Sequence, residues 1–342
     1  MYQIENIKNS ILCGDALLEL KKIPNETIDT IVTSPPYYGL RDYGNEKQIG
    51  LEKTPEEYVA KMVEVFSEVK RVLKKEGTLW LNLGDTYSAT RWTNKPGTGF
   101  QGEGSASNVR IEKVTALPDK NLVGIPWRVA FALQADGWYL RQDIIWSKPN
   151  PMPESVTDRC TKSHEYIFLL TKSPKYYFDN EAIKEKGGTG EDRPPGIVID
   201  RMFGYDSKEA FLRNRNKDGR KDGTVSGKGE AHATGTRTGG NLSAAYADVN
   251  WAEEKRNKRS VWTIPTHPFS EAHFATFPEA LIEPMIKAGC PEGGIVLDPF
   301  GGAMTTCVVA KKLRRKYIAI ELNPAYIEIG KRRLYAIPEP ML

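Results

Sequence analysis

The sequence predicts an α/β protein in which helices cover the faces of a mostly parallel sheet. Two observations indicate this class. Short apolar runs rich in β-branched residues alternate with longer segments whose apolar residues recur at helical spacing. Near the carboxyl end, residues 295–321 are typical of a strand, a glycine turn, a helix and a second strand, which is the βαβ unit of parallel sheets.

Local signals predict the elements of the first half in order. Residues 11–20 indicate a strand, a turn and the start of a helix, and Asp15 in that turn either caps the helix or contacts a ligand. A capping box at 54–57 begins a core-facing helix, which Gly77 is expected to end. The other expected elements are strands at 28–32, 78–83, 138–146 and 164–171 and a helix at 122–135.

Composition limits the classes of partner and site. The net charge is only +4, from 48 basic and 44 acidic residues, so any contact surface for nucleic acid must be local. No run of about 18 apolar residues occurs, and the amino terminus does not resemble a signal peptide. The four cysteines lack the paired spacing of a zinc site. We expect a soluble protein of a reducing compartment, with neither a membrane segment nor a metal site.

The first candidate site is the turn Ser34-Pro35-Pro36-Tyr37, which directly follows an apolar strand. Both prolines lack an N–H group and hold φ fixed, so the strand ends and the carbonyls of Ser34 and Pro35 remain available as acceptors. Such a corner suits a flat group that carries an amine, because the acceptors bind its hydrogens and the ring of Tyr37 stacks on it. An isolated turn of this kind is more often purely structural, so the interpretation depends on the rest of the chain.

The second candidate site is the glycine turn after the apolar strand at 295–297. Asp298 ends this strand, and Glu321 ends the next one, where a carboxylate suits ribose hydroxyls. The turn matches neither the dinucleotide fingerprint nor a P-loop. A carboxylate at the first strand end suits a cationic amino-acid group better than a pyrophosphate, and S-adenosylmethionine has this character. A purely structural strand–turn–helix unit is the alternative.

Residues 298–306, Asp-Pro-Phe-Gly-Gly-Ala-Met-Thr-Thr, resemble the cofactor motif of DNA amino-methyltransferases, and the turn at 34–37 resembles their catalytic motif. The catalytic motif comes first, as in the beta group of that family. Similar segments at 14–15, 144–150 and 273–279 extend the resemblance over nearly the whole chain except 88–118 and 184–259. The main departure is Met304, where the family usually has glycine.

This resemblance implies a Rossmann-like, mostly parallel sheet of seven strands with helices on both faces, and S-adenosyl-L-methionine as cofactor. It places the catalytic corner at Ser34, Pro35, Pro36 and Tyr37. It also implies that Glu321 binds the ribose, that Asp15 reaches the adenine edge and that Thr276 lies near the methionine tail. The full set of implied cofactor residues is Asp15, Thr276, Asp298, Pro299, Phe300, Gly301, Gly302, Glu321 and Asn323.

The implied reaction is methyl transfer to an exocyclic amine of a base flipped out of duplex DNA. Hydrogen bonds from the amine to Ser34 and to the carbonyl of Pro35 would free its lone pair for direct displacement, while Tyr37 stacks on the base. No cysteine follows a proline, which disfavours the covalent C5-cytosine mechanism. A serine at the first catalytic position is similar to N4-cytosine enzymes. N6-adenine remains the alternative, followed by an RNA methyltransferase or a catalytically silent module that binds an adenosine ligand.

The expected organisation has three parts: residues 1–183 are the catalytic half, with a mobile loop at 88–118, residues 184–260 are an inserted target-recognition region, and residues 261–342 are the cofactor half. The resemblance further implies a cognate restriction endonuclease, a homodimer and a cytoplasmic location in a prokaryote, or a phage origin. A basic cluster at 255–259 is either a solvated face or a track for phosphates. The basic residues expected to contact DNA are Arg41, Lys148, Arg159, Lys255 and Arg256.

Overall fold

The computed structural model describes residues 1–39, 48–88, 117–186, 255–266 and 277–338. The chain divides into two compact units, one of residues 1–183 with 259–342 and the other of residues 184–258. Two expected site residues, Arg41 and Thr276, lie outside the described residues, as do most of the loop at 88–118 and most of the region at 184–260. The roles expected for the three parts of the chain remain predictions.

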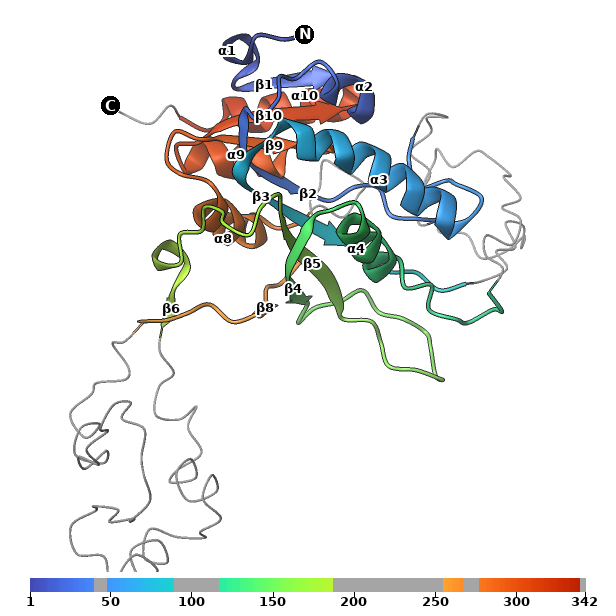
Figure 1. Cartoon of the computed structure of the whole chain (residues 1–342). Coiled ribbons are helices and arrows are strands. Elements are labelled where there is room, and N and C mark those ends of the chain that lie inside the picture. The colour runs from blue at the N-terminus through green and yellow to red at the C-terminus, as the bar shows by residue number, and fades with distance from the viewer. Residues whose placement is uncertain (40–47, 89–116, 187–254, 267–276, 339–342) are drawn as a thin grey trace, which may run out of the picture. The chain divides into compact units, whose positions relative to one another are not determined.

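The larger unit is built on one sheet of eight strands in the order β1-β10-β9-β2-β3-β5-β4-β8 (Figure 1). Neighbouring strands run parallel except that β5 is antiparallel to both β3 and β4. The strands are β1 (Ser10–Cys13), β2 (Ile28–Thr33), β3 (Leu73–Leu83), β4 (Tyr139–Ser147), β5 (His164–Thr171), β8 (Val261–Thr263), β9 (Ile295–Asp298) and β10 (Lys316–Glu321). The mostly parallel α/β class is therefore confirmed. The sheet has one strand more than expected because the short β8 pairs with the edge of β4.

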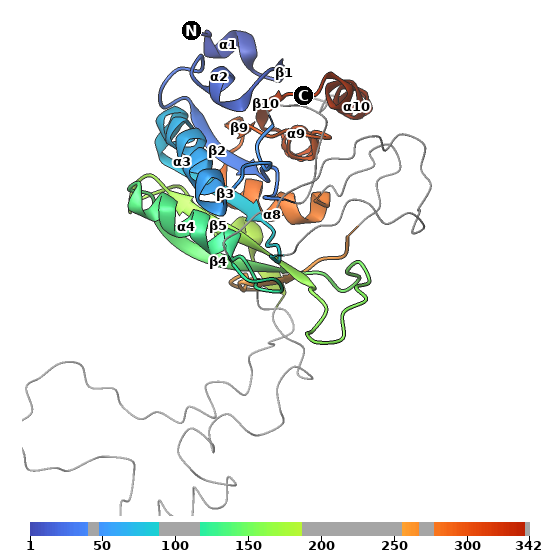
Figure 2. The same cartoon turned by 90° about the vertical axis from the view of Figure 1, so that its right-hand side faces the viewer.

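Helices cover both faces of this sheet (Figure 2). They are α1 (Ile4–Ile7), α2 (Ala16–Leu20), α3 (Pro55–Val72), α4 (Ile125–Ala135), α8 (Glu279–Gly289), α9 (Thr305–Lys312) and α10 (Pro324–Tyr335), with a short 3₁₀ turn at Glu181–Ile183. Alternate residues of β2 point to opposite faces: Ile31 packs in the core beneath α2, α3 and α4, and Val32 in the core beneath α8, α9 and α10. Because both faces are covered, every residue of β2 except Asp29 is buried, including Thr30 and Thr33.

Helix α3 begins as the capping box predicts but ends earlier. The hydroxyl of Thr54 accepts a hydrogen bond from the N–H of Glu57 at 3.1 Å, and Pro55 occupies the first turn. The helix stops at Val72, and Leu73 already belongs to β3. Gly77 lies inside that strand, where a Cβ atom would come within 2.8 Å of the carbonyl oxygen of Asp29. This glycine therefore permits the close approach of two strands rather than ending a helix.

Helix α4 begins at Ile125 rather than at 122, because the residue before it adopts a left-handed conformation. Gly124 has φ 78° and is the N-cap. The carboxylate of Asp85, just beyond β3, accepts hydrogen bonds from the N–H groups of Gly124 and Ile125, both at 3.0 Å. A carboxylate at this position satisfies donors that the first turn leaves free. The contact fixes α4 to the edge of the sheet where β3 ends.

The smaller unit is described only at residues 184–186 and 255–258. Its strands β6 (Glu185–Lys186) and β7 (Lys255–Arg256) pair antiparallel, and the Nε of Arg256 lies 3.0 Å from a carboxylate oxygen of Glu185. Within the described parts of the whole chain, no helix is both long and apolar enough to cross a membrane.

Candidate active site

The two candidate sites meet at one edge of the sheet, because β2 and β9 are adjacent parallel strands. The carboxyl ends of parallel strands lie together, and ligand sites of open α/β sheets form there. Thr33, the last residue of β2, donates a hydrogen bond of 2.7 Å from its hydroxyl to Oδ1 of Asp298, the last residue of β9. The turn at 34–37 and the glycine turn that follows Asp298 thus start from two directly bonded residues.

Contacts from two neighbouring segments hold the catalytic corner. The hydroxyl of Tyr58, on α3, donates to the carbonyl oxygen of Pro36 at 2.9 Å. A Cβ atom at Gly84 would lie 2.5 Å from Cε2 of Tyr37, so the absence of a side chain there makes room for the tyrosine ring. Ser34 and Tyr37 are both half-buried, whereas Pro35 is buried.

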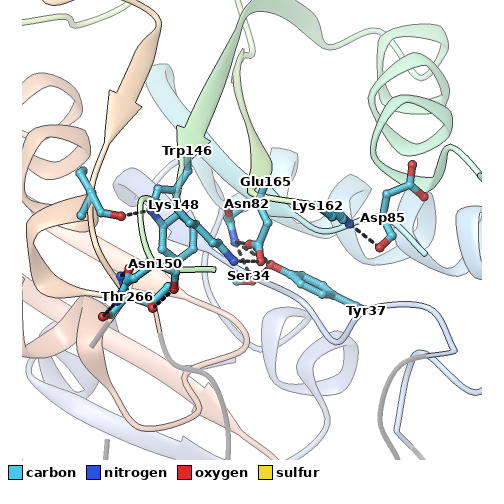
Figure 3. A network of polar contacts seen from close by, with 11 residues as sticks. Ser34, Tyr37, Asn82, Asp85, Trp146, Lys148, Asn150, Lys162, Glu165 and Thr266 are labelled. Atoms are coloured by element: carbon cyan, nitrogen blue, oxygen red, sulfur yellow. Dashed lines mark hydrogen bonds and ion pairs between the residues drawn. The ribbon is translucent and has the colours of Figure 1, made fainter. Parts of the chain in front are cut away.

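A polar network joins this corner to β3 and β5 (Figure 3). The hydroxyl of Tyr37 donates to Oε2 of Glu165 at 2.7 Å, and the hydroxyl of Ser34 donates to that of Tyr37 at 3.2 Å. The amide of Asn82 donates to the Tyr37 oxygen at 2.7 Å and to Glu165 at 2.9 Å, with Ser34 Oγ at 3.3 Å. The carbonyl oxygen of Asn82 is buried without a partner among the described residues. Lys148 forms an ion pair with the other oxygen of Glu165.

The charge state of this network follows from its burial and from the ammonium group of Lys148. Burial alone would raise the pKa of Glu165, but the Lys148 ammonium and the hydrogen bonds from Lys148, Asn82 and Tyr37 outweigh it and lower the pKa below its usual value. Burial raises the pKa of Tyr37 well above its usual value, and the Glu165 charge adds to that rise. At neutral pH the pair is therefore a neutral phenol that donates to an ionised carboxylate.

Asp298 is fully buried, and its carboxylate organises the glycine turn. Besides the bond from Thr33, it accepts from the hydroxyl of Thr306 at 2.7 Å and from the N–H of Phe300 at 3.1 Å. Burial raises the pKa of Asp298 to about 6, against these hydrogen bonds, which lower it. With no exposed surface, this side chain holds the glycine turn from within, and its contact with a cofactor stays a prediction.

Glu321 closes the other side of the turn. Its Oε2 accepts from the N–H of Gly302 at 2.7 Å, and its Oε1 accepts from the N–H of Asn323 at 2.8 Å. The Asn323 side chain caps α10 by accepting from Ala325 N–H at 2.9 Å. Burial raises the pKa of Glu321 despite these bonds. Each carboxylate oxygen has two lone pairs, so Glu321 can still accept from hydroxyl groups of a ligand.

The residues present fit an adenosine ligand at this turn. Gly302 has φ 49°, and a Cβ atom there would meet nothing within 4 Å, so the space beside the turn is open. Glu321 borders the turn with spare acceptor sites for ribose hydroxyls, and Phe300 is half-buried beside it. These donor and acceptor types suit a nucleoside better than a phosphate.

Met304 has φ 62°, a left-handed conformation that favours glycine, and its side chain is fully buried. Neighbouring glycines accommodate this side chain. A Cβ atom at Gly330, on α10, would lie 2.1 Å from Cγ of Met304, and one at Gly301 would lie 2.8 Å from its sulfur. The methionine therefore fills a space that two glycines leave beneath the turn rather than projecting towards the ligand.

The remaining expected site residues occupy varied positions. Asp15 caps α2 by accepting from the N–H of Leu18 at 3.0 Å, which is the structural role that its position allows. Arg159 pairs with Glu154 at 2.7 Å and lies 4.1 Å from the ring centroid of Tyr87. Pro299 is buried in the turn. Cofactor contacts by Asp15 and Pro299 stay predictions. So do the DNA contacts expected of four basic residues: Lys148, Arg159, Lys255 and Arg256.

Sequence reasoning did not identify Asn82 and Glu165. Both lie in strands expected to be buried: Asn82 interrupts the apolar run at 79–83, and Glu165 directly precedes the apolar run at 166–170. A buried polar group requires partners, so each polar side chain was a usable signal. What the sequence could not show is that β5 runs antiparallel to β3, which brings Glu165, near the start of β5, beside the end of β3.

Comparisons with known proteins agree with this architecture. The model of the DNA methylase family N6_N4_Mtase matches residues 28–332. The chain is similar to the Type II methyltransferase M.Cfr9I of Citrobacter freundii, with 42% identity over 94% of this chain and 86% of that protein. It is also similar to the Type II methyltransferase M.SmaI of Serratia marcescens, with 40% identity over 95% and 90% of the two chains.

Solved structures share the fold at lower identity. The PvuII DNA methyltransferase, described as cytosine-N4-specific, superposes with a TM-score of 0.54 at 19% identity, over 98% of this chain and 88% of that one. A putative DNA modification methylase from Thermus thermophilus, complexed with S-adenosyl-L-methionine, superposes with a TM-score of 0.52 at 21% identity, over 95% and 92% of the two chains.

Proposed function

The chain belongs to the N6/N4 family of DNA methylases, and from this premise we propose that it methylates the exocyclic N4 amine of cytosine in duplex DNA. The observation that carries the proposal is the bond between Thr33 and Asp298, because it joins an amine-binding corner to an adenosine-binding turn. S-adenosylmethionine is the proposed cofactor and supplies, when bound, a methyl group that is open to attack by a nitrogen lone pair.

The corner activates the amine by accepting its hydrogens. The nitrogen of an exocyclic amine is a poor nucleophile because its lone pair is delocalised into the ring. Hydrogen bonds to Ser34 Oγ and to the Pro35 carbonyl oxygen would pyramidalise the nitrogen and return the lone pair to it. The ring of Tyr37 stacks on the flipped base and aligns the amine for direct displacement.

The glycine turn holds the cofactor. Phe300, Gly301 and Gly302 line the adenosine and methionine parts, and Glu321 accepts from the ribose hydroxyls. Asp298 and Pro299 act from beneath by fixing the turn. Further contacts are assigned to three more residues: Asp15, Thr276 and Asn323.

The choice of cytosine rests on Ser34, which is similar to the first catalytic residue of N4-cytosine enzymes. The names of relatives point in both directions: the PvuII enzyme is called cytosine-N4-specific, and a relative from Escherichia coli that is 26% identical is called a DNA adenine methyltransferase. N6-adenine is therefore the second candidate.

Since the more similar relatives are named Type II methyltransferases, we also propose a role in restriction–modification, with a cognate endonuclease that cuts the same site.

Contacts to DNA and target recognition are assigned to the segments at 88–118 and 184–260, together with five basic residues: Arg41, Lys148, Arg159, Lys255 and Arg256. Exchanging residues 184–260 with those of a relative of different specificity should transfer the sequence preference. An unchanged preference after that exchange would remove this part of the proposal.

A homodimer is the proposed assembly, and sedimentation at micromolar concentration tests it.

Transfer of a radiolabelled methyl group to duplex DNA and to single-stranded RNA tests the reaction class. We expect DNA to be labelled by the wild type, with a loss of about a hundredfold or more in Ser34→Ala, the range typical of one electrostatic contact to a reacting group. Preferential labelling of RNA would identify an RNA enzyme. Cofactor binding without labelling, unaltered by Ser34→Ala, would identify a silent module.

A further inference from the structure

We propose that Glu165 is the terminal acceptor of a hydrogen-bond relay that takes a proton from the target amine through Ser34 and Tyr37. This inference rests on the proposed function and adds to it a positioning and proton-accepting residue. The relay is directional in the structure: Ser34 donates to Tyr37 at 3.2 Å, and Tyr37 donates to Glu165 at 2.7 Å.

Asn82 enforces that direction. Its amide group lies 2.7 Å from the Tyr37 oxygen and 2.9 Å from Oε2 of Glu165. The opposite orientation of the amide would place its carbonyl oxygen against the carboxylate, so Asn82 presents its two hydrogens to these acceptors. With a lone pair of the Tyr37 oxygen occupied by Asn82 and another by Ser34, the phenol proton points to Glu165.

The reaction needs such an acceptor. When the amine nitrogen forms its bond to the methyl carbon, the carbon–sulfur bond breaks with its electron pair going to sulfur, and the nitrogen becomes positively charged. The corner residues Ser34, Pro35, Pro36 and Tyr37 contain no carboxylate. In the relay one N–H proton passes to Ser34 Oγ, the Ser34 hydroxyl proton passes to Tyr37, and the Tyr37 proton passes to Glu165. The products are a neutral methylamine, a neutral thioether and a protonated Glu165, which returns its proton to solvent through its exposed fraction of 15%.

The charges around Glu165 keep it ready to accept. Lys148 faces it from the end of β4, Tyr37 faces it from the corner, and Lys162 acts on it from farther along the same edge, where its ammonium contacts the carbonyl of Asp85 at 2.5 Å. The Lys148 ammonium keeps the carboxylate ionised. An amine of this kind, once methylated and cationic, is a far stronger acid than a carboxylic acid, so even a weakly basic Glu165 suffices.

The first test is Glu165→Gln, measured as the single-turnover rate of methyl transfer with saturating cofactor and DNA. Glutamine keeps the shape and can still accept from Tyr37, but it cannot take up the proton. We expect the rate to fall about a hundredfold to ten-thousandfold, as for other lost proton acceptors, with dissociation constants for S-adenosylmethionine and DNA within about twofold of wild type. The matched control is Glu64→Gln, which removes an exposed glutamate paired with Lys61 on α3 and should leave the rate unchanged.

A pH profile separates the relay from a merely structural role. Lys148→Gln removes the cation that lowers the pKa of Glu165, so burial should raise that pKa. The relay works only with the carboxylate ionised, so the single-turnover rate falls when Glu165 becomes protonated at acid pH. In Lys148→Gln this acid limb of the pH profile should lie at a higher pH than in wild type. The double variant Lys148→Gln/Glu165→Gln should lack this acid limb.

A wild-type rate in Glu165→Gln, or an acid limb that persists in the double variant, would overturn the relay. Either result leaves the proposed function intact, because wild-type DNA methylation is measured in the same assay. Absence of methyl transfer by the wild type would instead overturn the proposed function itself.

Discussion

Thr33 donates a 2.7 Å hydrogen bond to Asp298 across a sequence separation of 265 residues, at the point where β2 and β9 end side by side. Neither residue is exposed, and neither belongs to the catalytic corner itself. Their contact sets the distance between the corner and the cofactor turn. Substitution of either residue should therefore lower both the free energy of unfolding and the affinity for the cofactor. The two effects can be measured independently.

Replacing Thr33 by valine should weaken both stability and cofactor binding. The substitution keeps the shape but leaves a fully buried carboxylate with one donor fewer, which costs about 1–3 kcal/mol. Urea unfolding and calorimetric titration with S-adenosylmethionine measure the two effects. Thr30→Val is the control, because Thr30 bonds to Thr78 within the sheet, away from the turn. It should lose stability without losing cofactor affinity, and equal affinity losses in the two variants would contradict the arrangement.

Asp298 predicts a specific dependence of stability on pH. Its pKa is about 6 in the folded protein against a usual value of 3.8, so the folded state binds this proton more tightly than the unfolded chain. Protonated Asp298 therefore contributes to the free energy of unfolding below the unfolded-state pKa of 3.8. This contribution is lost as pH rises through the folded-state pKa of about 6. The free energy of unfolding of wild type relative to Asp298→Asn should fall by up to about 3 kcal/mol between about pH 4 and pH 7. Urea titrations of both proteins across this range measure the difference, and a rise instead of a fall would contradict the pKa.

Met304 and Gly330 should behave as a coupled pair. Gly330→Ala alone places a Cβ atom 2.1 Å from Cγ of Met304, so we expect a loss of about 1–3 kcal/mol from overpacking. Met304→Gly removes the obstructing side chain and relieves its left-handed backbone, but it leaves a cavity. In the Met304→Gly background, Gly330→Ala should therefore cost much less stability than it costs in the wild type. Additive losses in thermal unfolding would show that the two residues do not share one space.

Glu321→Gln should lower the affinity for S-adenosylmethionine about tenfold or more, since hydrogen bonds to a charged group contribute roughly 1.5–3 kcal/mol. The control is Glu328→Gln, an exposed glutamate on α10 that pairs with Lys331 at 2.8 Å. Isothermal titration compares the two variants. Similar dissociation constants for Glu321→Gln and wild type would exclude this carboxylate from the ribose site.

Particular residues show how far the sequence leads. The strand at His164–Thr171 has the bounds expected from its apolar run, and Asp298 and Glu321 end neighbouring strands as the βαβ pattern predicts. These features depend on local composition and on the regularity of parallel sheets. The expected end of α3 was wrong because Leu73 continues the helical spacing, while pairing with Ile28 places it in β3. Tertiary pairing overrides local preference in such cases.

The polar network was beyond local reasoning for a similar cause. Tyr37, Asn82 and Glu165 come from three segments whose proximity depends on the reversed direction of β5. The burial of Asp298 is also a tertiary property, because it depends on Thr33 and Thr306 closing over the carboxylate. Residue type alone suggested contact with the ligand, and it gave no sign of the internal hydrogen bonds that this side chain accepts.

The identity of the methylated base is the sharpest test of methyl transfer to cytosine at the corner formed by residues 34–37. Duplex DNA treated with the purified protein and isotopically labelled S-adenosylmethionine can be digested to nucleosides and separated by mass spectrometry, with Ser34→Ala as the paired control. We expect labelled N4-methylcytosine with wild type and its near absence with the variant. Labelled N6-methyladenine would overturn the assignment to cytosine, and the absence of any labelled base would contradict DNA methylation by this corner.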